Sequence, residues 1–317
     1  GAVELDVGAL SDGTDVHVAG IMQHIEEAGV HSGDSACCLP PHSLPKPIIA
    51  EITRQTEALA RALGVVGLMN VQFAVRDHQV YILEVNPRAS RTIPFVSKSI
   101  GAPLAQYAAR AMAGESLQQI GFTEERIPRY YSVKESVFPF TKFPEIDCIL
   151  GPQMQSTGEV MGIDPSFELS YLKAQISAGN EPPAQQGKVF LSVRDGDKWS
   201  AIPVAKRLVD LGFELVSTRG TAGLLRVHGL PVKAINKVKE GQPHIVDAII
   251  NGEITMVINT TTGSQSIQDS RSIRRATINQ SIPYFTTLPA ARAAANAMAA
   301  SKESESTVRS VQEYHAE

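Results

Sequence analysis

The strongest pattern of apolar and polar positions in the chain is a pair of apolar segments around a short polar turn. Residues 71–75 read VQFAV, residues 80–85 read VYILEV, and the polar residues 77–79 separate them. Two strand-like segments joined by a short polar loop are typical of an antiparallel hairpin. The pattern therefore predicts a β-hairpin in this part of the chain.

The apolar side chains of this hairpin indicate its register. A three-residue loop would place the bulky side chains on one buried face, as a half-covered sheet requires. The expected pairs on that face are Val75 with Tyr81, Phe73 with Leu83, and Val71 with Val85. Gln72 then lies opposite Glu84 on the other face, because side-chain direction alternates along a strand. Asn70 likewise lies opposite Asn86.

Apolar spacing also predicts the elements around the hairpin. The first residues of the chain form a strand, and residues 45–63 form a helix that is opened by prolines and closed by a glycine. Residues 94–113 are rich in alanine and are predicted to be helical. The polar, Gly- and Pro-rich residues 179–187 mark a flexible join, so a new domain is expected to begin after them.

Strands and helices alternate beyond residue 187. The predicted strands are residues 189–193, 214–218, 232–235, 254–258 and 284–286. Such alternation implies a parallel sheet with helices on both faces. Small polar residues collect at four strand ends: Ser192, Thr218 to Thr221, Asn236 with Lys237, and Asn259 to Thr261. Because ligands bind beyond the carboxyl ends of such strands, we expect a phosphate pocket there.

Composition and charge narrow the class of protein. The 317 residues exceed what one core usually organises, so two or three domains are expected. A net charge of -4 without a long basic run argues against nucleic acid as a partner. No apolar stretch reaches the roughly 20 residues of a membrane span, so a cytoplasmic protein without membrane contact is expected. Cys37, Cys38 and Cys148 are expected to stay reduced.

The polar face of the predicted hairpin has the chemistry of a metal site. Gln72, Glu84 and Asn86 offer oxygen ligands with little charge, a set that suits Mg²⁺ completed by waters and substrate phosphates. Arg88 and Arg91 follow directly, and guanidinium groups bind phosphate through forked hydrogen bonds. A Gln/Glu pair alone would be better explained as the solvated face of a hairpin. The asparagine and the two arginines favour the metal site.

These residues carry a family resemblance. The segment EVNPRASR after NVQFAV resembles the ATP-grasp ligases, and the whole stretch is similar to the large subunits of carbamoyl phosphate synthetase. The resemblance continues through HIEEAGVHSGDSA, PFVSKSIGAPLAQYAARAMAG and YYSVKESVFPF and covers essentially the whole chain. It implies an α/β protein with three parts: an α+β ATP-grasp C-terminal lobe in residues 1–114, a closing segment and linker in 115–186, and a doubly wound, methylglyoxal-synthase-like domain in 187–317.

The resemblance implies roles for residues of the synthetase half. Arg88 and Arg91 would be catalytic, and Gln72, Glu84 and Asn86 would hold Mg²⁺ or Mn²⁺. The residues implied to bind ATP are Glu4, Gly29, Val30, His31, Ser32, Gln72 and Glu84. The residues implied to bind the activator ornithine are Glu26, Asp34, Glu135, Tyr284 and Thr286. Taken alone, Glu26 would be a solvated helix residue and Asp34 a turn former.

The resemblance also implies an allosteric nucleotide site in residues 187–317, for UMP or IMP. The residues implied to line it are Ser192, Lys198, Thr218, Thr221, Lys237, Asn259 and Thr261. Thr218 and Thr221 could instead be helix caps. Ser264 and Gln265 stand where many relatives have basic residues, so one phosphate contact is expected to be missing. The next helix carries three arginines, Arg271, Arg274 and Arg275. They either compensate for the missing phosphate contact or form a solvated face of the helix, and we favour the solvated face.

The function implied is that of the C-terminal part of a glutamine-dependent carbamoyl phosphate synthetase large subunit. This ATP-dependent ligase makes carbamoyl phosphate from bicarbonate, ammonia and two MgATP for arginine and pyrimidine biosynthesis. A small glutaminase subunit, K⁺ and self-association through the allosteric domain are also implied. The front lobe with its glycine-rich flap does not precede Gly1, so we expect negligible ATP turnover by the chain alone.

Three alternatives remain open at the level of sequence. The chain could act as an effector-binding module, as another ATP-grasp ligase, or as a lyase like methylglyoxal synthase. The lyase would need a carboxylate base near a bound triose phosphate. The candidates for that base are Asp195, Asp197 and Asp269.

Overall fold

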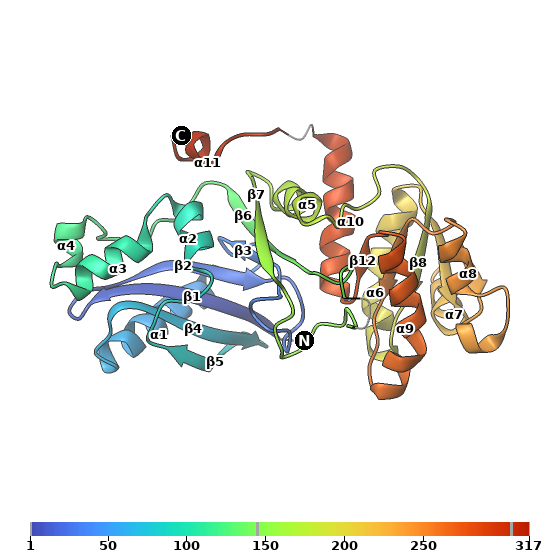
Figure 1. Cartoon of the computed structure of the whole chain (residues 1–317), viewed down its shortest axis with the longest axis horizontal. Coiled ribbons are helices and arrows are strands. Elements are labelled where there is room, and N and C mark those ends of the chain that lie inside the picture. Colours follow the sequence, from blue (N-terminus) through green and yellow to red (C-terminus); the bar gives the residue numbers. More distant parts are fainter. Residues whose placement is uncertain (1, 144–145, 305–306, 317) are drawn as a thin grey trace. The chain divides into compact units, whose positions relative to one another are not determined.

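The computed structural model describes residues 2–143, 146–304 and 307–316, and these form two compact units (Figure 1). Unit 1 comprises Gly1–Glu135, Met161–Ser170 and Ser306–Glu317. Unit 2 comprises Ser136–Val160 and Tyr171–Glu305.

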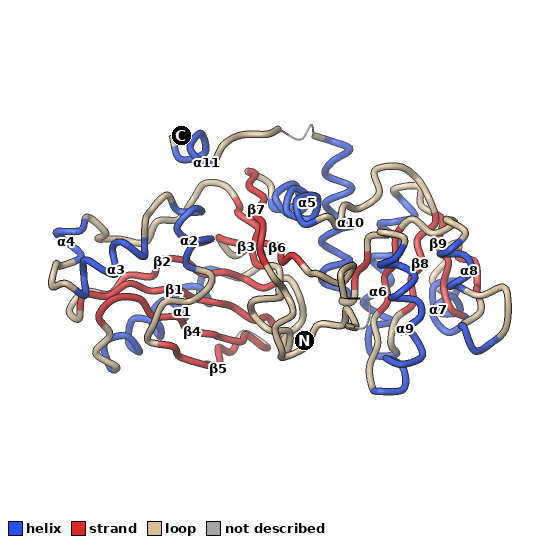
Figure 2. The backbone as a smooth tube through the Cα atoms, in the orientation of Figure 1, coloured by secondary structure: helices blue, strands red, loops and turns tan. Residues whose placement is uncertain are grey.

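A seven-stranded sheet begins the fold (Figure 2). Its strands are β1 (Val3–Asp12), β2 (Val16–His24), β3 (Cys37–Leu39), β4 (Val66–Arg76), β5 (Gln79–Asn86), β6 (Tyr131–Val137) and β7 (Gly158–Asp164). Their order is β5-β4-β1-β2-β3-β6-β7, and neighbours from β5 to β6 are antiparallel. The predicted first strand and the predicted hairpin are confirmed as β1 and as β4 with β5.

Helices cover both faces of the unit 1 sheet, but one face only in part. Helix α1 (Lys46–Ala62) follows Pro45 and packs Ile48 and Ile52 against apolar residues of β1 and β4. The helices on the other face are α2 (Ile93–Ile100), α3 (Leu104–Met112) and α4 (Leu117–Ile120), and they pack on Leu10 and Met22. The rest of that second face is polar. Helix α5 (Phe167–Ala178) follows β7, and α11 (Val311–His315) ends the chain.

Residues 94–113 are mostly helical, as predicted, and the structure divides them into two helices. Helix α2 stops at Gly101, whose φ of 65° lies in the left-handed region that favours glycine. Pro103 precedes α3 and disfavours a continuous helix at that point.

Unit 2 contains a five-stranded parallel sheet, as predicted. Its strands are β8 (Lys188–Ser192), β9 (Glu214–Thr218), β10 (Val232–Ile235), β11 (Met256–Asn259) and β12 (Tyr284–Phe285). The strand order is β10-β9-β8-β11-β12, and each neighbouring pair of strands is parallel. The chain therefore winds outward in both directions from β8, which is the doubly wound arrangement.

Helices alternate with these strands and bury both faces of the sheet. They are α6 (Lys198–Asp210), α7 (Arg219–Val227), α8 (Ile245–Ile250), α9 (Ser264–Asn279) and α10 (Leu288–Glu303), with short 3₁₀ turns at Asp195–Asp197 and Val238–Glu240. Phe190 and Val257 pack with residues of α8 and α9. Val189, Leu191 and Ile258 point the other way and are also buried, so both faces are covered.

Two further expectations are answered by the structure. Cys37, Cys38 and Cys148 are buried free thiols, as predicted. Within the described residues, no helix is long and apolar enough to span a membrane.

Candidate functional site

The part of the unit 1 sheet that the helices leave uncovered carries polar side chains on three adjacent strands. Asp6 of β1 pairs in register with Gln72 of β4, and Gln72 pairs with Glu84 of β5. Asn70 pairs with Asn86, and its side-chain amide donates to Asp6 Oδ1 at 2.9 Å. Cross-strand partners project to the same face, so these five side chains gather on one surface. The predicted pairs at this end of the hairpin are confirmed.

The hairpin departs from the predicted register beyond Gln72. Phe73 pairs with Ile82, and Leu83 is left unpaired as a β-bulge. A two-residue turn closes the hairpin at Asp77 and His78, whose positive φ angles of 51° and 62° match a type I′ turn. The predicted pairs Phe73 with Leu83 and Val75 with Tyr81 are therefore wrong.

The expectation of a buried apolar face on β5 is also wrong beyond the bulge. Tyr81, Ile82 and Leu83 are about half exposed, at 48%, 46% and 52%. Strand β5 is the edge of the sheet and has a single neighbour, β4. An edge strand does not need a face that is covered along its whole length, so its apolar residues can be partly exposed.

The two predicted catalytic arginines lie directly after β5, and both are exposed. The Arg88 guanidinium donates to Asn86 Oδ1 at 3.2 Å and to the carbonyl of Ala89 at 3.0 Å. Its backbone N–H also donates to the carbonyl of Asn86 at 2.8 Å. Arg88 therefore stands beside the predicted metal ligands and orients one of them. Arg91 follows on the same connection to α2.

A loop between β2 and β3, residues 25–36, is held on the polar face by residues of several strands. Glu4 Oε1 of β1 accepts the Gly29 N–H at 3.1 Å. The Gln72 amide of β4 donates to Ser32 Oγ at 3.2 Å. Lys134 of β6 donates to the backbone carbonyls of Ser32 and Gly33. The structure thus brings together four of the residues predicted to bind ATP: Glu4, Gly29, Ser32 and Gln72. Val30 and His31 lie between two of them in the loop.

A buried histidine links two carboxylates beneath this loop. His24 Nδ1 is 3.6 Å from Glu4 Oε2, and its Nε2 is 3.6 Å from Asp6 Oδ2. Burial lowers the pKa of His24, but the neighbouring Cys37 and Asp6 outweigh it and raise the pKa to about 10. Burial has the opposite effect on Asp6 and raises its pKa. The hydrogen bonds and charge of His24, and the hydrogen bond from Asn70, outweigh burial and hold the pKa of Asp6 below its usual value. Both groups are therefore charged at neutral pH.

Three of the residues predicted to bind an amine lie at the other end of the loop. Glu26 Oε2 accepts the Ala36 N–H at 2.6 Å, and burial raises the pKa of Glu26 to about 7. The alternative of a solvated helix residue is wrong, since Glu26 follows β2 in a turn. Asp34 and Glu135 are 1% and 7% exposed.

The other two residues of the predicted amine site, Tyr284 and Thr286, belong to unit 2. The Tyr284 backbone N–H donates to Asn180 Oδ1 at 3.1 Å. Its hydroxyl is buried beside the Cys148 thiol. Burial, followed by the neighbouring Cys148, raises the pKa of Tyr284 well above its usual value.

The donor set on the hairpin fits a hard cation that keeps part of its water shell. Among the described residues no group of three or more His, Cys, Asp or Glu side chains could hold a metal, and the predicted ligand set includes two amide oxygens. The Gln72 amide nitrogen donates to Ser32, which leaves its oxygen available. The amide oxygens of Gln72 and Asn86 and the Glu84 carboxylate together form a set of oxygen ligands with one negative charge. Such a set suits Mg²⁺ that is also bound by phosphates.

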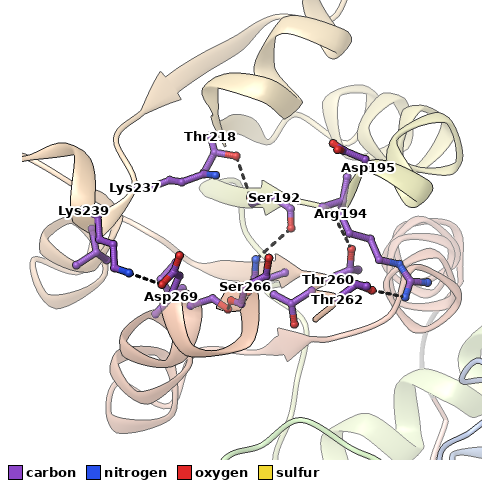
Figure 3. Close-up of a pocket in the computed structure, with 16 residues that line it drawn as sticks. Ser192, Arg194, Asp195, Thr218, Lys237, Lys239, Thr260, Thr262, Ser266 and Asp269 are labelled. Atoms are coloured by element: carbon purple, nitrogen blue, oxygen red, sulfur yellow. Dashed lines mark hydrogen bonds and ion pairs between the residues drawn. The ribbon is translucent and has the colours of Figure 1, made fainter. Parts of the chain in front are cut away.

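Unit 2 contains a cavity of about 310 Å³ at the carboxyl ends of its strands (Figure 3). Strands β8 and β11 are adjacent but lead to helices in opposite directions, so the cavity lies at the topological switch point where such folds bind ligands. Five of the residues predicted to bind an effector line it: Ser192, Thr218, Lys237, Asn259 and Thr261.

Hydrogen bonds between strand ends fix the floor of this cavity. The hydroxyls of Ser192 and Thr218 lie 2.9 Å apart. The Asn259 amide donates to the carbonyl of Ser192 at 3.1 Å, and Thr260 Oγ1 accepts the Arg194 N–H at 3.1 Å. Thr218 precedes α7 but makes no side-chain cap bond, so the alternative of a helix cap is not supported for it.

The charges at the cavity leave one lysine without a carboxylate. Arg194 pairs with Asp197 at 2.8 Å. Lys239 pairs with Asp269 at 2.6 Å (Figure 3). Among the cations that line the cavity in the described part of the chain, Lys237 alone has no ion-pair partner. It is therefore the most available group for an anionic ligand.

Two predicted effector residues do not line the cavity. Lys198 pairs with Asp195 at 2.7 Å, and Thr221 Oγ1 accepts the Val193 N–H at 3.3 Å. Arg194, Lys239 and Asp269 do line it and were missed by the sequence analysis as ligand contacts. Arg194 stands two residues after the end of β8, and this position close to a carboxyl strand end could have indicated that it contacts a ligand.

Helix α9 carries the three arginines that were predicted either to compensate for a missing phosphate contact or to form a solvated face. Gln265, at the position where a basic residue was expected, donates to Asp269 Oδ1 at 2.7 Å. Arg274 is 2% exposed and makes a two-point ion pair with Asp147, so the solvated-face interpretation is wrong for it. Arg271 and Arg275 are exposed.

Comparisons with known proteins identify the families of two parts of the chain. Residues 2–120 match the family model "Carbamoyl-phosphate synthase L chain, ATP binding domain", and residues 200–286 match "MGS-like domain". The chain is 54% identical, over its whole length, to the carbamoyl phosphate synthase large chain of Mesorhizobium japonicum. It is 56% identical over 99% of its length to that of Pasteurella multocida. It spans 27% and 29% of these two relatives.

Among solved structures, the biotin carboxylase domain of a single-chain bacterial carboxylase is similar at 18% identity. The match covers 57% of this chain and 47% of that one, and its TM-score of 0.46 is too low to support an argument.

The two matched models, a carbamoyl-phosphate synthase ATP-binding domain followed in the sequence by an MGS-like domain, define the class of protein. At this identity over the full chain, the protein belongs to the carbamoyl phosphate synthase large-chain family. The predicted family and the predicted α/β fold class are confirmed. The domain boundaries after residues 114 and 186 stay predictions.

Proposed function

We propose that the chain is the C-terminal part of the large subunit of a glutamine-dependent carbamoyl phosphate synthetase. The complete enzyme would be a cytoplasmic ATP-dependent ligase that forms carbamoyl phosphate for arginine and pyrimidine biosynthesis. The observation that carries the proposal is identity of more than half to such large chains along the whole chain. The pairing of Gln72 with Glu84 supports it, because that pairing builds the oxygen ligands a nucleotide-bound metal requires.

In this proposal, unit 1 supplies half of a carbamate-phosphorylating site. Gln72, Glu84 and Asn86 hold Mg²⁺ or Mn²⁺, which would neutralise the charge that develops on the transferred phosphoryl group. The loop held by Glu4 and Lys134 presents His31 and Ser32 to the nucleotide. Arg88 and Arg91 hold the anionic acceptor and product. Catalysis of this kind depends on position and electrostatics more than on covalent chemistry.

Unit 2 would be the regulatory part. A nucleoside monophosphate such as UMP or IMP would place its phosphate on Lys237 and the hydroxyls of the strand ends. Ornithine would bring its amine to Glu26, Asp34 and Glu135. The small glutaminase subunit, K⁺ and self-association through this unit belong to the same proposal.

The lyase alternative is disfavoured by the charges in the cavity. The pKa of Asp195 is lowered by Lys198, and the pKa of Asp269 is lowered by Lys239 and Gln265. Asp197 is paired with Arg194. An ion-paired carboxylate with a lowered pKa is a poor general base for proton abstraction from a triose phosphate.

Calorimetric titration of the chain with UMP and then IMP tests the regulatory assignment. Saturable binding is expected, and Lys237→Ala should weaken it about tenfold or more, since a charged hydrogen bond to phosphate is lost. Lys233→Ala is the matched control: Lys233 lies on β10, pairs with Glu214 at 2.8 Å and does not line the cavity. Absence of binding by folded protein, or equal effects of the two variants, would contradict the assignment.

A further inference from the structure

Lys134 of β6 is a buried lysine for which the sequence motifs suggest no role. It is 1% exposed. Its register partner on β3 is Cys37, which in turn pairs with His24 of β2. Because cross-strand partners share a face, Lys134 lies on the polar face of the sheet, beneath the loop of residues 25–36. A buried ammonium group persists only where partners replace its lost hydration.

The hydrogen bonds of Lys134 are directed at the nucleotide-binding loop. Its Nζ donates to the carbonyl of Ser32 at 3.2 Å and to the carbonyl of Gly33 at 3.3 Å. Both acceptors are backbone groups, while the nearby negative charge comes from Asp6 and Glu26. A lysine that served only as an ion-pair partner would be expected to donate its hydrogen bonds to a carboxylate. Here the ammonium group instead holds two consecutive peptide groups.

Those two peptide groups hold His31. The peptide that contains the Ser32 carbonyl also contains the Gly33 N–H, which donates to His31 Nδ1 at 3.0 Å. The next peptide joins the Gly33 carbonyl to the Asp34 N–H, which donates to the His31 carbonyl at 2.8 Å. Peptide groups are planar, so fixing the direction of each carbonyl also fixes the direction of its N–H. Lys134 therefore orients both donors to His31.

The first of these bonds also selects the tautomer of His31. Because Nδ1 accepts the Gly33 N–H, the ring proton resides on Nε2. The ring then offers an N–H donor on the side away from the loop backbone. His31 is one of the residues predicted to contact the nucleotide, and a fixed ring with a defined donor is what recognition of a phosphate or ribose oxygen requires.

We propose that Lys134 is a positioning residue of the nucleotide site, which sets the ring orientation and tautomer of His31 through two peptide groups. The identity of the ligand rests on the function proposed above, whereas the contacts within the loop do not. Lys134 touches neither substrate nor metal in this proposal. Its effect reaches them through the loop.

The test uses the complete enzyme and the variant Lys134→Met, which keeps the length of the side chain and removes the charge and the donors. Phosphoryl transfer from carbamoyl phosphate to MgADP is measured, since this reverse step isolates the carbamate-phosphorylating half. The KM for MgADP is expected to rise about tenfold or more, because a charged group with two hydrogen bonds is lost, with a smaller change in kcat. Backbone hydrogen exchange of Gly33, Asp34 and Ser35 is expected to accelerate.

Two controls separate positioning from general damage. Lys98→Met makes the same chemical change at an exposed position of α2 and should leave KM unchanged. Ile52→Val removes one buried methyl group from α1 and should lower stability without raising KM. If Lys134→Met leaves KM and loop exchange at the values of the unaltered enzyme, the proposal is wrong. The same conclusion follows if Ile52→Val raises KM equally.

A second variant and a measurement on the unaltered enzyme cover failure to fold. Lys134→Gln keeps hydrogen-bond donors without the charge and should give an intermediate KM. If neither variant folds, backbone hydrogen exchange is measured in the unaltered enzyme. The amides of Gly33, Asp34 and Ser35 should exchange far more slowly than the amide of the exposed Ala28. Equal exchange rates would overturn the proposal. An unaltered enzyme without carbamoyl phosphate chemistry would refute the proposed function, while loop exchange would still test Lys134.

Discussion

At the scale of single residues, Glu26 is the carboxyl group whose ionisation the fold opposes most clearly. Burial raises its pKa to about 7 from an ordinary 4.5. A carboxyl pKa that is higher in the folded state gives stability that is complete below the unfolded pKa and is lost as pH rises through the folded one. The affected window therefore runs from about pH 4.5 to about pH 7.

The neutral variant Glu26→Gln should relieve this cost. We expect its Tm to exceed that of the unaltered chain by several degrees at pH 8, on the order of 5 °C, and by little at pH 5. Thermal denaturation followed by circular dichroism at the two pH values measures the difference. An equal gain at both would show that Glu26 does not ionise within this window. The same variant should weaken binding of an amine effector, which would be favoured by the carboxylate.

Asp269 is the residue that limits the positive charge of the unit 2 cavity. It neutralises Lys239 and also accepts a hydrogen bond from Gln265. Asp269→Asn should free Lys239 for a phosphate and tighten UMP binding by up to about tenfold, since partly exposed ion pairs are modest in strength. Glu253→Gln breaks a similar pair with Lys188, outside the cavity, and should change nothing. Calorimetry distinguishes them, and weaker binding by Asp269→Asn would show that the carboxylate contacts the ligand.

The residues that sequence could assign differ physically from those it could not. Gln72 and Glu84 were paired correctly because a strand alternates its faces regardless of what surrounds it. The burial of Arg274 depends on Asp147, more than a hundred positions away. Lys134 depends in the same way on the carbonyls of Ser32 and Gly33. No local periodicity distinguishes a buried, hydrogen-bonded cation from a solvated one.

At the scale of elements, the terminal helix α11 is attached to unit 1 by a few strong contacts. Tyr314 is 5% exposed, and its hydroxyl donates to the carbonyl of Ile163 at 2.9 Å. Its ring lies 5.1 Å from that of Tyr130. His315 adds contacts at 2.6 Å to the carbonyl of Lys98 and at 2.8 Å to the Tyr130 hydroxyl. A five-residue helix cannot be stable alone, so these contacts define it.

Removing the Tyr314 ring should therefore detach α11. Tyr314→Ala is expected to lower the free energy of unfolding of unit 1 by about 3–5 kcal/mol, and Tyr314→Phe by about 1 kcal/mol. Chemical denaturation followed by circular dichroism measures both. The exposed Gln312→Ala, on the same helix, is the control. If Tyr314→Ala costs no more than Gln312→Ala, the helix contributes little to the unit.

The ends of strands and helices were predicted best where the residues on both sides of the element indicated a boundary. The five strands of unit 2 alternate with helices, and β8, β9 and β11 end on polar residues, so the sheet and the place of its cavity could be predicted. In the hairpin, the tight turn at Asp77 and His78 and the bulge at Leu83 compensate one another. Each shifts the register by one residue in opposite directions, and apolar patterns cannot resolve such a pair of shifts.

At the scale of the whole molecule, the two candidate sites lie in different compact units. Glu84 is in unit 1, and the cavity around Lys237 is in unit 2. Substitutions that alter one site and do not unfold the chain should leave ligand binding at the other measurable. This separation makes it possible to distinguish loss of chemistry from loss of the folded protein.

Glu84→Gln in the complete enzyme uses that separation. The amide removes the only charge among the three predicted metal ligands, so carbamoyl phosphate synthesis should fall on the order of 100-fold or more. UMP binding should be unchanged, because no residue of its cavity is altered. Glu51→Gln, at an exposed ion pair with Arg54 on α1, should leave both properties intact. Loss of both properties in Glu84→Gln would mean that the variant is misfolded or that the chain is divided differently. Retained synthesis would refute Glu84 as a metal ligand and would leave the hairpin as an ordinary sheet edge with a polar face.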